Sequence, residues 1–163
     1  MKDSKLVKCC SLLAQKKLKI AFAESATSGA LAASFALTPN SGDILLGSMV
    51  CYDADEKSNI LQIPKKVIEE YTPESSEVTA LMAKGAKKIF EKADIIVAVT
   101  GLIKKGGSEK VGKPVGTMFI HFIFPDYEYR IKEVFHGNSI KIMRQTILKI
   151  ADIVTEQIAE IEL

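Results

Sequence analysis

The sequence has few residues of the kinds that bind metals or form disulfides. Among its 163 residues there are two histidines, no tryptophan and three cysteines, Cys9, Cys10 and Cys51. An odd number of cysteines, two of them adjacent, offers neither a disulfide framework nor the paired spacing of a zinc site. We therefore expect reduced thiols, a cytoplasmic location and a mechanism without a metal ion.

The charge is nearly balanced. The 22 basic and 20 acidic residues leave a net charge of +2, too little for the basic footprint of a nucleic-acid-binding protein. The longest apolar runs have the length of strands, and the N-terminus leads into an amphipathic helix without an export signal. We expect a protein that binds neither nucleic acid nor membranes, and the length predicts a single domain over residues 1–163.

Apolar segments of strand length alternate with helical patterns along the chain. The apolar run 44–52 is typical of a strand covered on both faces, whereas 127–135 is more polar and is expected nearer an edge. Pro125-Asp126 indicates an antiparallel hairpin. The alternation predicts an α/β fold, a three-layer α/β/α domain with a mixed sheet. The strands are predicted at about 18–23, 44–52, 94–101, 115–124 and 127–135, and the final helix at about 139–161.

The segment Ala23-Glu24-Ser25-Ala26-Thr27-Ser28-Gly29 joins the first predicted strand to a helix. Small and hydroxyl residues at such a junction let backbone N–H groups and an unhindered side-chain oxygen point at one bound group. Ser25 is the candidate nucleophile. The alternative is an N-capped helix without a function of its own.

A serine nucleophile needs a base, and the sequence offers no suitable histidine. Lys57, which follows the second strand, is the candidate base, and Tyr52 at the strand end could relay the proton. For this role the pKa of Lys57 must fall by about 3 from roughly 10.4, through burial or nearby positive charge. The alternatives are a solvated helix lysine that pairs with Asp53 and a phenol at the edge of the core.

The third strand ends in Thr100-Gly101, and a loop with further glycines follows it. Ligands of open α/β sheets bind at the carboxyl ends of strands, where Ser25, Tyr52 and Thr100 are all expected. Gly106, Gly107 and the surrounding lysines could hold a phosphate. The alternative is a mobile surface turn.

Taken together, an ordered set of motifs resembles the CinA C-terminal domain family over residues 5–160. The resemblance implies a nicotinamide-nucleotide amidase, which hydrolyses nicotinamide mononucleotide to nicotinate mononucleotide and ammonia, without a cofactor and as a homo-oligomer. The motifs are residues 23–29, 47–52 with Lys57, 75–78, 97–101 and 113–117.

The resemblance also implies roles for individual positions. Ser25 matches the nucleophile of the family, and Tyr52 with Lys57 its proton-handling pair. A small-molecule nucleotide would be held by residues of the first junction, the third strand end, the glycine loop and the last helix. These substrate-binding positions are Thr27, Ser28, Gly29, Thr100, Gly101, Gly106, Gly107 and Arg144.

The chain departs from the family pattern at several positions. Ala26 replaces the usual cysteine, Ser28 a glycine, and Leu102–Lys105 the usual alanine, glycine and proline. Ser139 replaces an arginine before the last helix. A second arginine of the family pattern aligns with Met143, so that Arg144 stands one position away from it. The alternative function is therefore a nucleotide-binding or regulatory protein that has lost turnover.

Overall fold

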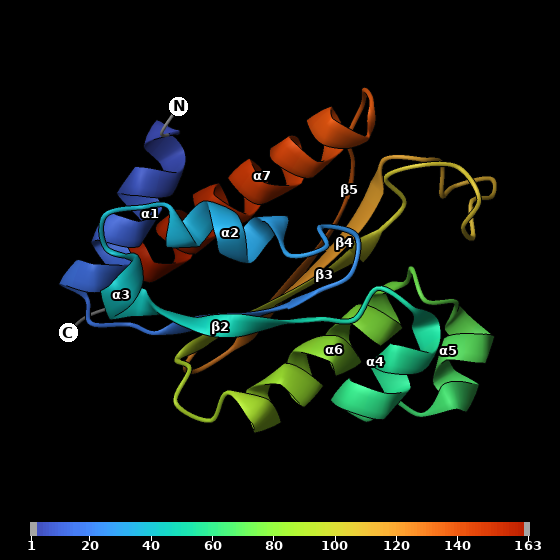
Figure 1. Cartoon of the computed structure of the whole chain (residues 1–163), viewed down its shortest axis with the longest axis horizontal. Coiled ribbons are helices and arrows are strands. Elements are labelled where there is room, and N and C mark those ends of the chain that lie inside the picture. The colour runs from blue at the N-terminus through green and yellow to red at the C-terminus, as the bar shows by residue number, and fades with distance from the viewer. Residues whose placement is uncertain (1–2, 162–163) are drawn as a thin grey trace.

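The strand β1 (Ile20–Glu24) has apolar side chains on both of its faces. In this computed structural model, which describes residues 3–161, Ile20 and Phe22 face one apolar cluster, and Ala21 and Ala23 face another. All four side chains are fully buried. A strand buried on both faces requires helices on both sides, and the elements form three layers (Figure 1). Residues 1–2 and 162–163, which the predicted domain 1–163 includes, lie outside the described residues.

One face of the sheet is covered by helices from the two ends of the chain. Helix α1 begins with Asp3 as its N-cap and packs beside α7, the last helix, as Figure 1 shows. The predicted apolar repeat of α7 is confirmed, since Ile147, Ile150 and Val154 are buried in the core. This layer consists of α1 (Ser4–Gln15), α2 (Ala30–Ala36), α3 (Ser41–Ile44) and α7 (Ser139–Ala159).

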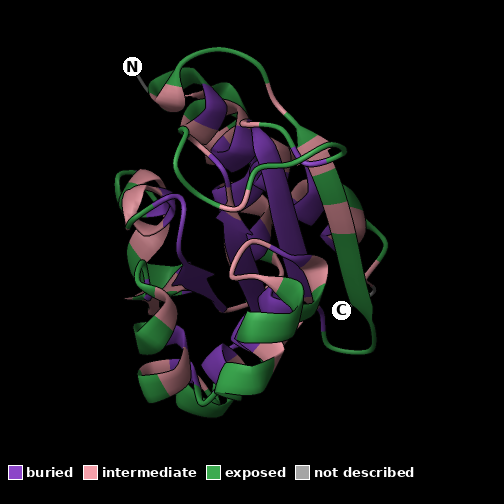
Figure 2. Cartoon of the chain, turned by 90° about the vertical axis from the view of Figure 1, so that its right-hand side faces the viewer, coloured by how far each residue is buried: buried purple, intermediate pink, exposed green. Residues whose placement is uncertain are grey.

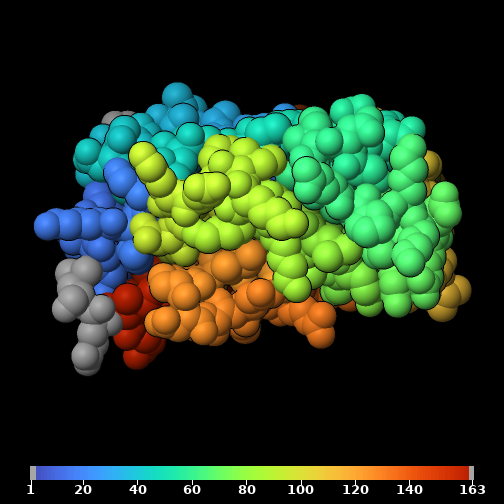
Figure 3. Space-filling view, turned by 90° about the horizontal axis from the view of Figure 1, so that it is seen from below, coloured from blue at the N-terminus to red at the C-terminus, as the bar shows by residue number. Residues whose placement is uncertain are grey.

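The opposite face is covered by α4 (Ala54–Leu61), α5 (Lys65–Tyr71) and α6 (Ser76–Ile89), which Figure 3 shows as the green surface above the hairpin strands. Helix α6 approaches α4 closely at Gly85. A Cβ atom on Gly85 would lie 2.5 Å from the carbonyl oxygen of Leu61. The absence of a side chain at Gly85 therefore allows the position that α4 takes.

Within residues 3–161 the strands form one mixed sheet in the order β2-β1-β3-β4-β5. β1 runs parallel to β2 (Leu45–Val50) and β3 (Ile95–Gly101), and β3, β4 (Thr117–Ile123) and β5 (Glu128–Val134) are antiparallel. The predicted hairpin and the edge position of its second strand are confirmed. Figure 2 shows the contrast between the buried inner strands and the exposed β5.

The prediction of a strand at 44–52 is correct, but the prediction that it is buried on both faces is wrong. β2 is the other edge of the sheet, and none of its residues is buried: Leu46 and Val50 are exposed and the other four are intermediate. Leu46 and Val50 are 39% and 44% exposed. β2 also contains one extra residue, because Ile20 pairs with Leu45 while Ala21 pairs with Gly47.

The carboxyl ends of β1, β2 and β3 meet at one edge of the sheet. Glu24 lies between Val50 and Val99 in the register. The hydrogen bonds between the three strands continue one residue past their ends. Ser25 N donates to Val99 O at 3.0 Å, and Cys51 N donates to Glu24 O at 2.8 Å. This is the edge at which open α/β sheets bind ligands. No helix within residues 3–161 is long and apolar enough to cross a membrane.

Candidate active site

Ser25 and Lys57 are in direct contact at this edge of the sheet. Ser25 follows β1, Lys57 lies in α4, and Lys57 Nζ is 2.9 Å from Ser25 Oγ. The two side chains are buried, with Lys57 only 1% exposed. The structure therefore brings the candidate nucleophile and its candidate base within hydrogen-bond distance.

Two backbone carbonyls fix the direction of the lysine. Lys57 Nζ lies 3.0 Å from Cys51 O and 3.3 Å from Tyr52 O. Burial lowers the pKa of Lys57 below its ordinary value, and the negative charge of Glu74, with smaller effects of Cys51 and Asp53, partly opposes this. The alternative of a solvated lysine paired with Asp53 is wrong, because the Asp53 carboxylate instead accepts a hydrogen bond from Asp55 N.

Tyr52 lies at the pocket, but its hydroxyl does not lie between Ser25 and Lys57. Its side chain lines the same pocket as Ser25 and is 53% exposed. Its hydroxyl makes no hydrogen bond to any residue that the structure describes, while Lys57 contacts Ser25 directly. The predicted relay through the phenol is therefore not needed, and the contribution of Tyr52 to the lysine is its carbonyl oxygen.

The turn after Ser25 is held by a residue that the sequence analysis did not select, Glu24. Its fully buried carboxylate accepts hydrogen bonds from Thr27 Oγ1 at 2.7 Å and Gly29 N at 2.9 Å. Leu31 N, Ala32 N and Ser48 Oγ, at 3.1, 3.0 and 2.9 Å, complete its partners. An acidic residue a few positions before a helix start was the available signal, since a carboxylate accepts the free N–H groups at the first turn.

These contacts correct the roles predicted for Thr27, Ser28 and Gly29. The Thr27 hydroxyl and the Gly29 N–H are bound to Glu24, and Ser28 N donates to Ser25 O at 3.0 Å. None of these donors is free for a substrate oxyanion. The N–H groups of Ala26 and Thr27, by contrast, make no hydrogen bond within residues 3–161.

The same turn contains two residues with positive φ. Ser28 has φ +50° and Gly29 has φ +93°, which lets the chain pass from the strand end into α2. Ser28 is exposed. Its side chain is therefore at the surface of the turn, outside the pocket lining.

A cavity of about 180 Å³ opens in front of Ser25. The glycine loop forms one wall, and Gly106 and Gly107 line it, while their predicted role in binding substrate stays a prediction. Lys104 and Lys105 belong to the same wall and are exposed. The lining consists of Ser25, Ala26, Tyr52, Glu74, Gly101 and residues 102–107.

Lys113 attaches the exposed glycine loop to the segment that contains Thr72 and Glu74. The Lys113 side chain is buried, and its Nζ donates to Ser108 Oγ at 2.7 Å, Thr72 Oγ1 at 2.8 Å and Glu74 O at 3.0 Å. Ser108 Oγ in turn donates to Glu74 Oε2 at 2.5 Å. Burial also lowers the pKa of Lys113, and the charge of Glu74 opposes this.

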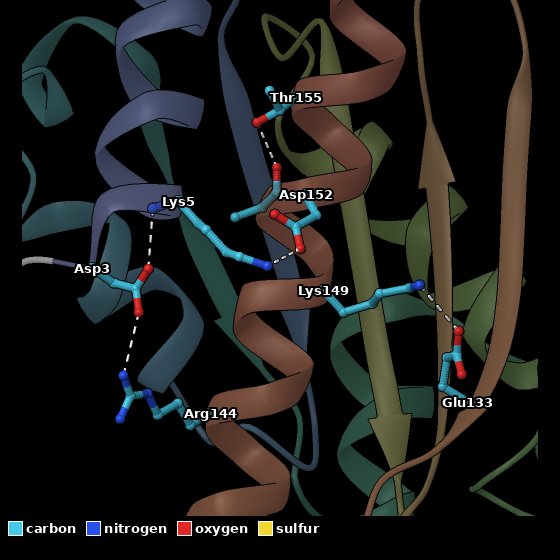
Figure 4. Close-up of polar contacts among 8 residues, drawn as sticks. Asp3, Lys5, Glu133, Arg144, Lys149, Asp152 and Thr155 are labelled. Atoms are coloured by element: carbon cyan, nitrogen blue, oxygen red, sulfur yellow. Dashed lines mark hydrogen bonds and ion pairs between the residues drawn. The ribbon is translucent and has the colours of Figure 1, made fainter.

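Two further predicted substrate-binding residues do not line the pocket. Thr100 is 1% exposed, and its hydroxyl lies 3.3 Å from the carbonyl of Pro73, so that only Gly101 of the pair reaches the cavity. Arg144 lies on α7 and points to Asp3 at 3.4 Å (Figure 4). It borders a different hollow, of about 560 Å³, between α1, α2 and α7.

The part of the chain that the structure describes contains no group of three histidine, cysteine, aspartate or glutamate residues placed to hold a metal ion. Cys9, Cys10 and Cys51 are buried free thiols. Burial raises the pKa of Cys9 to about 12, which keeps this thiol protonated. Ser25 lines the pocket, whereas Lys57 lies behind it and contacts the Ser25 hydroxyl.

Comparison with protein families gives one match that covers almost the whole chain. The profile of the CinA C-terminal domain matches residues 3–158. A CinA-like protein of Petrotoga mobilis is 34% identical over 135 residues, which are 82% of this chain and 33% of that protein. A CinA-like protein of Fervidobacterium nodosum is 40% identical over 116 residues, 71% of this chain and 28% of that protein. The aligned region thus spans about a third of these curated relatives.

Solved structures show the same fold. A competence damage-inducible protein A from Klebsiella pneumoniae superimposes with a TM-score of 0.90 and 21% identity, covering 97% of both chains. A CinA superfamily protein from Escherichia coli superimposes with a TM-score of 0.86 and 23% identity, covering 96% of this chain and 90% of that one.

Proposed function

The chain belongs to the CinA C-terminal domain family, and we propose that it is an amidohydrolase in which Ser25 is the nucleophile and Lys57 the general base. The observation that carries the proposal is the 2.9 Å contact between Ser25 Oγ and the Nζ of a fully buried lysine. Serine needs such a base to become nucleophilic, and a lysine can be one when burial lowers its pKa.

The surroundings of Lys57 suit a neutral amine. A neutral amine has two N–H bonds and one lone pair. If the N–H bonds are directed at the carbonyls of Cys51 and Tyr52, the lone pair is left for the hydroxyl proton of Ser25. The two carbonyls would thus orient the base without a third side chain.

The reaction proceeds through an acyl-enzyme. Ser25 Oγ attacks the carboxamide carbon while its proton passes to Lys57 Nζ, and the carbonyl oxygen becomes an oxyanion. The unpaired N–H groups of Ala26 and Thr27 are the candidate donors to this oxyanion. The C–N bond then breaks, and Lys57 returns the proton to the leaving nitrogen, which departs as ammonia.

Water completes the cycle. Lys57 takes a proton from a water molecule while the water oxygen attacks the acyl carbon. The bond between the acyl carbon and Ser25 Oγ then breaks. The proton on Lys57 returns to Ser25, and a carboxylic acid leaves. The sum is hydrolysis of one amide to an acid and ammonia, with no cofactor.

We propose nicotinamide mononucleotide as the substrate and nicotinate mononucleotide as the product. The set of motifs that resembles the family supports this choice, together with a pocket that Ser25 shares with Lys104 and Lys105. Two lysines at the rim are suitable partners for a phosphate. The absence of an arginine from the lining predicts weaker turnover than in relatives that have one at this place.

An ammonia-release assay on nicotinamide mononucleotide tests the proposal. Ser25→Ala and Lys57→Met should each lower the rate by about 10³-fold or more, while binding of the nucleotide persists. Ser58→Ala is the matched control, because Ser58 lies next to Lys57 in α4 and its hydroxyl has no partner within residues 3–161. Equal ammonia release by wild type and Ser25→Ala, with binding retained, would leave a nucleotide-binding protein without turnover.

We also propose a homo-oligomer in the cytoplasm. Leu37 and Ile140 are each 78% exposed and border the hollow between α1, α2 and α7. Exposed apolar side chains beside a hollow are suited to contact between copies. Light scattering that gives only the monomer mass at micromolar concentration would contradict the oligomer.

A further inference from the structure

Glu74 brings a carboxylate to the wall of the Ser25 pocket. One of its oxygens, Oε2, accepts the hydrogen bond from Ser108. The other, Oε1, accepts none from the residues described, and it would lie 3.6 Å from a Cβ atom on Gly107 in the loop wall. Among residues 3–161 no lysine, arginine or histidine nitrogen lies within 4.0 Å of this carboxylate. The carboxylate therefore has no direct ion-pair partner, and the nearest linked ammonium, that of Lys113, reaches it through the Ser108 hydroxyl.

The segment that holds Glu74 is fixed in a strained conformation. Thr72 has φ +70°, a value that a β-branched residue rarely adopts. Lys113 bonds the Thr72 hydroxyl and the Glu74 carbonyl, and it also bonds Ser108, the partner of the carboxylate. Lys113 therefore fixes both the backbone and the side chain of Glu74 against the glycine loop.

The charge of Glu74 acts on Lys57. It is the largest of the charge effects that raise the pKa of Lys57, and so it opposes the role of that lysine as a base. A positive charge in the pocket would offset this effect, because it would be attracted by Glu74 and would disfavour protonated Lys57.

We propose that Glu74 makes the Ser25 pocket selective for a carboxamide on a positively charged ring, a pyridinium. This inference rests on the proposed function and identifies the part of the substrate that Glu74 recognises. A pyridinium mononucleotide carries a positive ring and a negative phosphate. The pocket wall offers both complements, a carboxylate at Glu74 and two lysines at Lys104 and Lys105.

Two forms of the same nucleotide separate ring charge from every other contact. Nicotinamide mononucleotide has a pyridinium ring, whereas its reduced form has an uncharged dihydropyridine ring with the same carboxamide, ribose and phosphate. Binding of both is measured by calorimetry to the Ser25→Ala variant, so that no turnover interferes. We expect this variant to bind the charged form about 3- to 10-fold more tightly, as one charge pair across a partly solvated pocket predicts.

Glu74→Gln in the Ser25→Ala background should remove this preference, mainly by weakening the charged form. Glu74→Asp should retain a preference of the same sign. Glu77→Gln is the matched control, because Glu77 is an exposed carboxylate three residues further on that does not line the pocket. Its removal should leave the preference unchanged.

The outcomes are distinguishable. If the Glu74→Gln variant still prefers the charged nucleotide over the reduced one, the role of Glu74 is wrong. The role is also wrong if Glu77→Gln removes this preference to the same extent as Glu74→Gln. If Ser25→Ala binds neither nucleotide, the proposed substrate itself is wrong, and this inference falls with it. Thermal unfolding of each variant verifies that the fold is intact, and Glu74→Asp provides the rescue should Glu74→Gln unfold.

Discussion

The carbonyl oxygen of Cys51 lies 3.0 Å from Lys57 Nζ, so the end of β2 orients the candidate base in α4. Cys51 N is bound to Glu24 O, next to Ser25 in the chain. The backbone of two neighbouring strands thus positions both members of the pair. Solvent has little influence on this geometry, because Cys51 and Lys57 are buried.

Amide hydrolysis should increase with pH through the pKa of Lys57. In the proposed mechanism the active form is the neutral amine, and burial places the pKa of Lys57 below the ordinary value of 10.5. Glu74→Gln should move the rise in kcat/KM to lower pH, since the charge that raises the pKa of Lys57 is removed. The measurement is kcat/KM against pH for wild type and Glu74→Gln. A rise centred above 10.5, or one that moves to higher pH in the variant, would contradict the assignment.

Protein stability should also change with pH because of Lys57. Its pKa is lower in the folded chain than in the unfolded chain, so between the two values the unfolded chain binds more protons. The free energy of unfolding from this group therefore rises as the pH increases from the folded pKa toward 10.5. Urea unfolding of wild type and Lys57→Met across this interval should show a smaller rise in the variant. Lys66→Met, which changes an exposed lysine of α5, should leave the rise unchanged.

Glu24→Gln should destabilise the fold by about 2–4 kcal/mol. An amide presents one acceptor oxygen and an NH₂ group to a site where five donors converge on a carboxylate. Ser48→Ala removes one of these donors and should cost about 1 kcal/mol. Chemical denaturation gives both values. Equal losses in the two variants would show that the carboxylate is not the organising group of the turn.

Gly85→Ala should reduce both stability and activity. Alanine normally favours a helix interior by about 1 kcal/mol over glycine, but here its Cβ would lie 2.5 Å from Leu61 O in α4. We expect a net loss of about 1–3 kcal/mol and slower turnover, because α4 contains Lys57. Gly42→Ala is the control, since nothing lies within 4 Å of a Cβ at that position. Unchanged activity in Gly85→Ala would indicate that α4 tolerates the shift.

The sequence predicted most of the layer structure, because apolar period and turn residues are local signals. It failed at β2, where the apolar run suggested an inner strand. The order of strands in a sheet depends on pairing between segments that are far apart in the sequence. An edge strand that packs against helices can also be as apolar as an inner strand. Leu46 and Val50 therefore looked like core residues although both are exposed.

The candidate site could be predicted in part. Ser25 and Lys57 each follow a strand, and parallel neighbouring strands bring their ends together. The position of Glu24 before a helix start was a signal, but the direction of its side chain into the turn cannot be derived from residue spacing. Arg144 was selected for its place near the start of the last helix, but one step along a helix turns a side chain by about 100°, and it faces Asp3 instead.

The extra residue in β2 determines where the chain can change length without harm. Leu46 lies before the pairs from Ala21–Gly47 to Glu24–Val50, so an insertion or deletion there is absorbed at the base of the sheet. A residue lost between Gly47 and Val50 would instead draw Cys51 back by about 3.3 Å and turn its carbonyl away from α4. We therefore expect length variation to be tolerated at the start of β2 and to be disruptive in its last four residues.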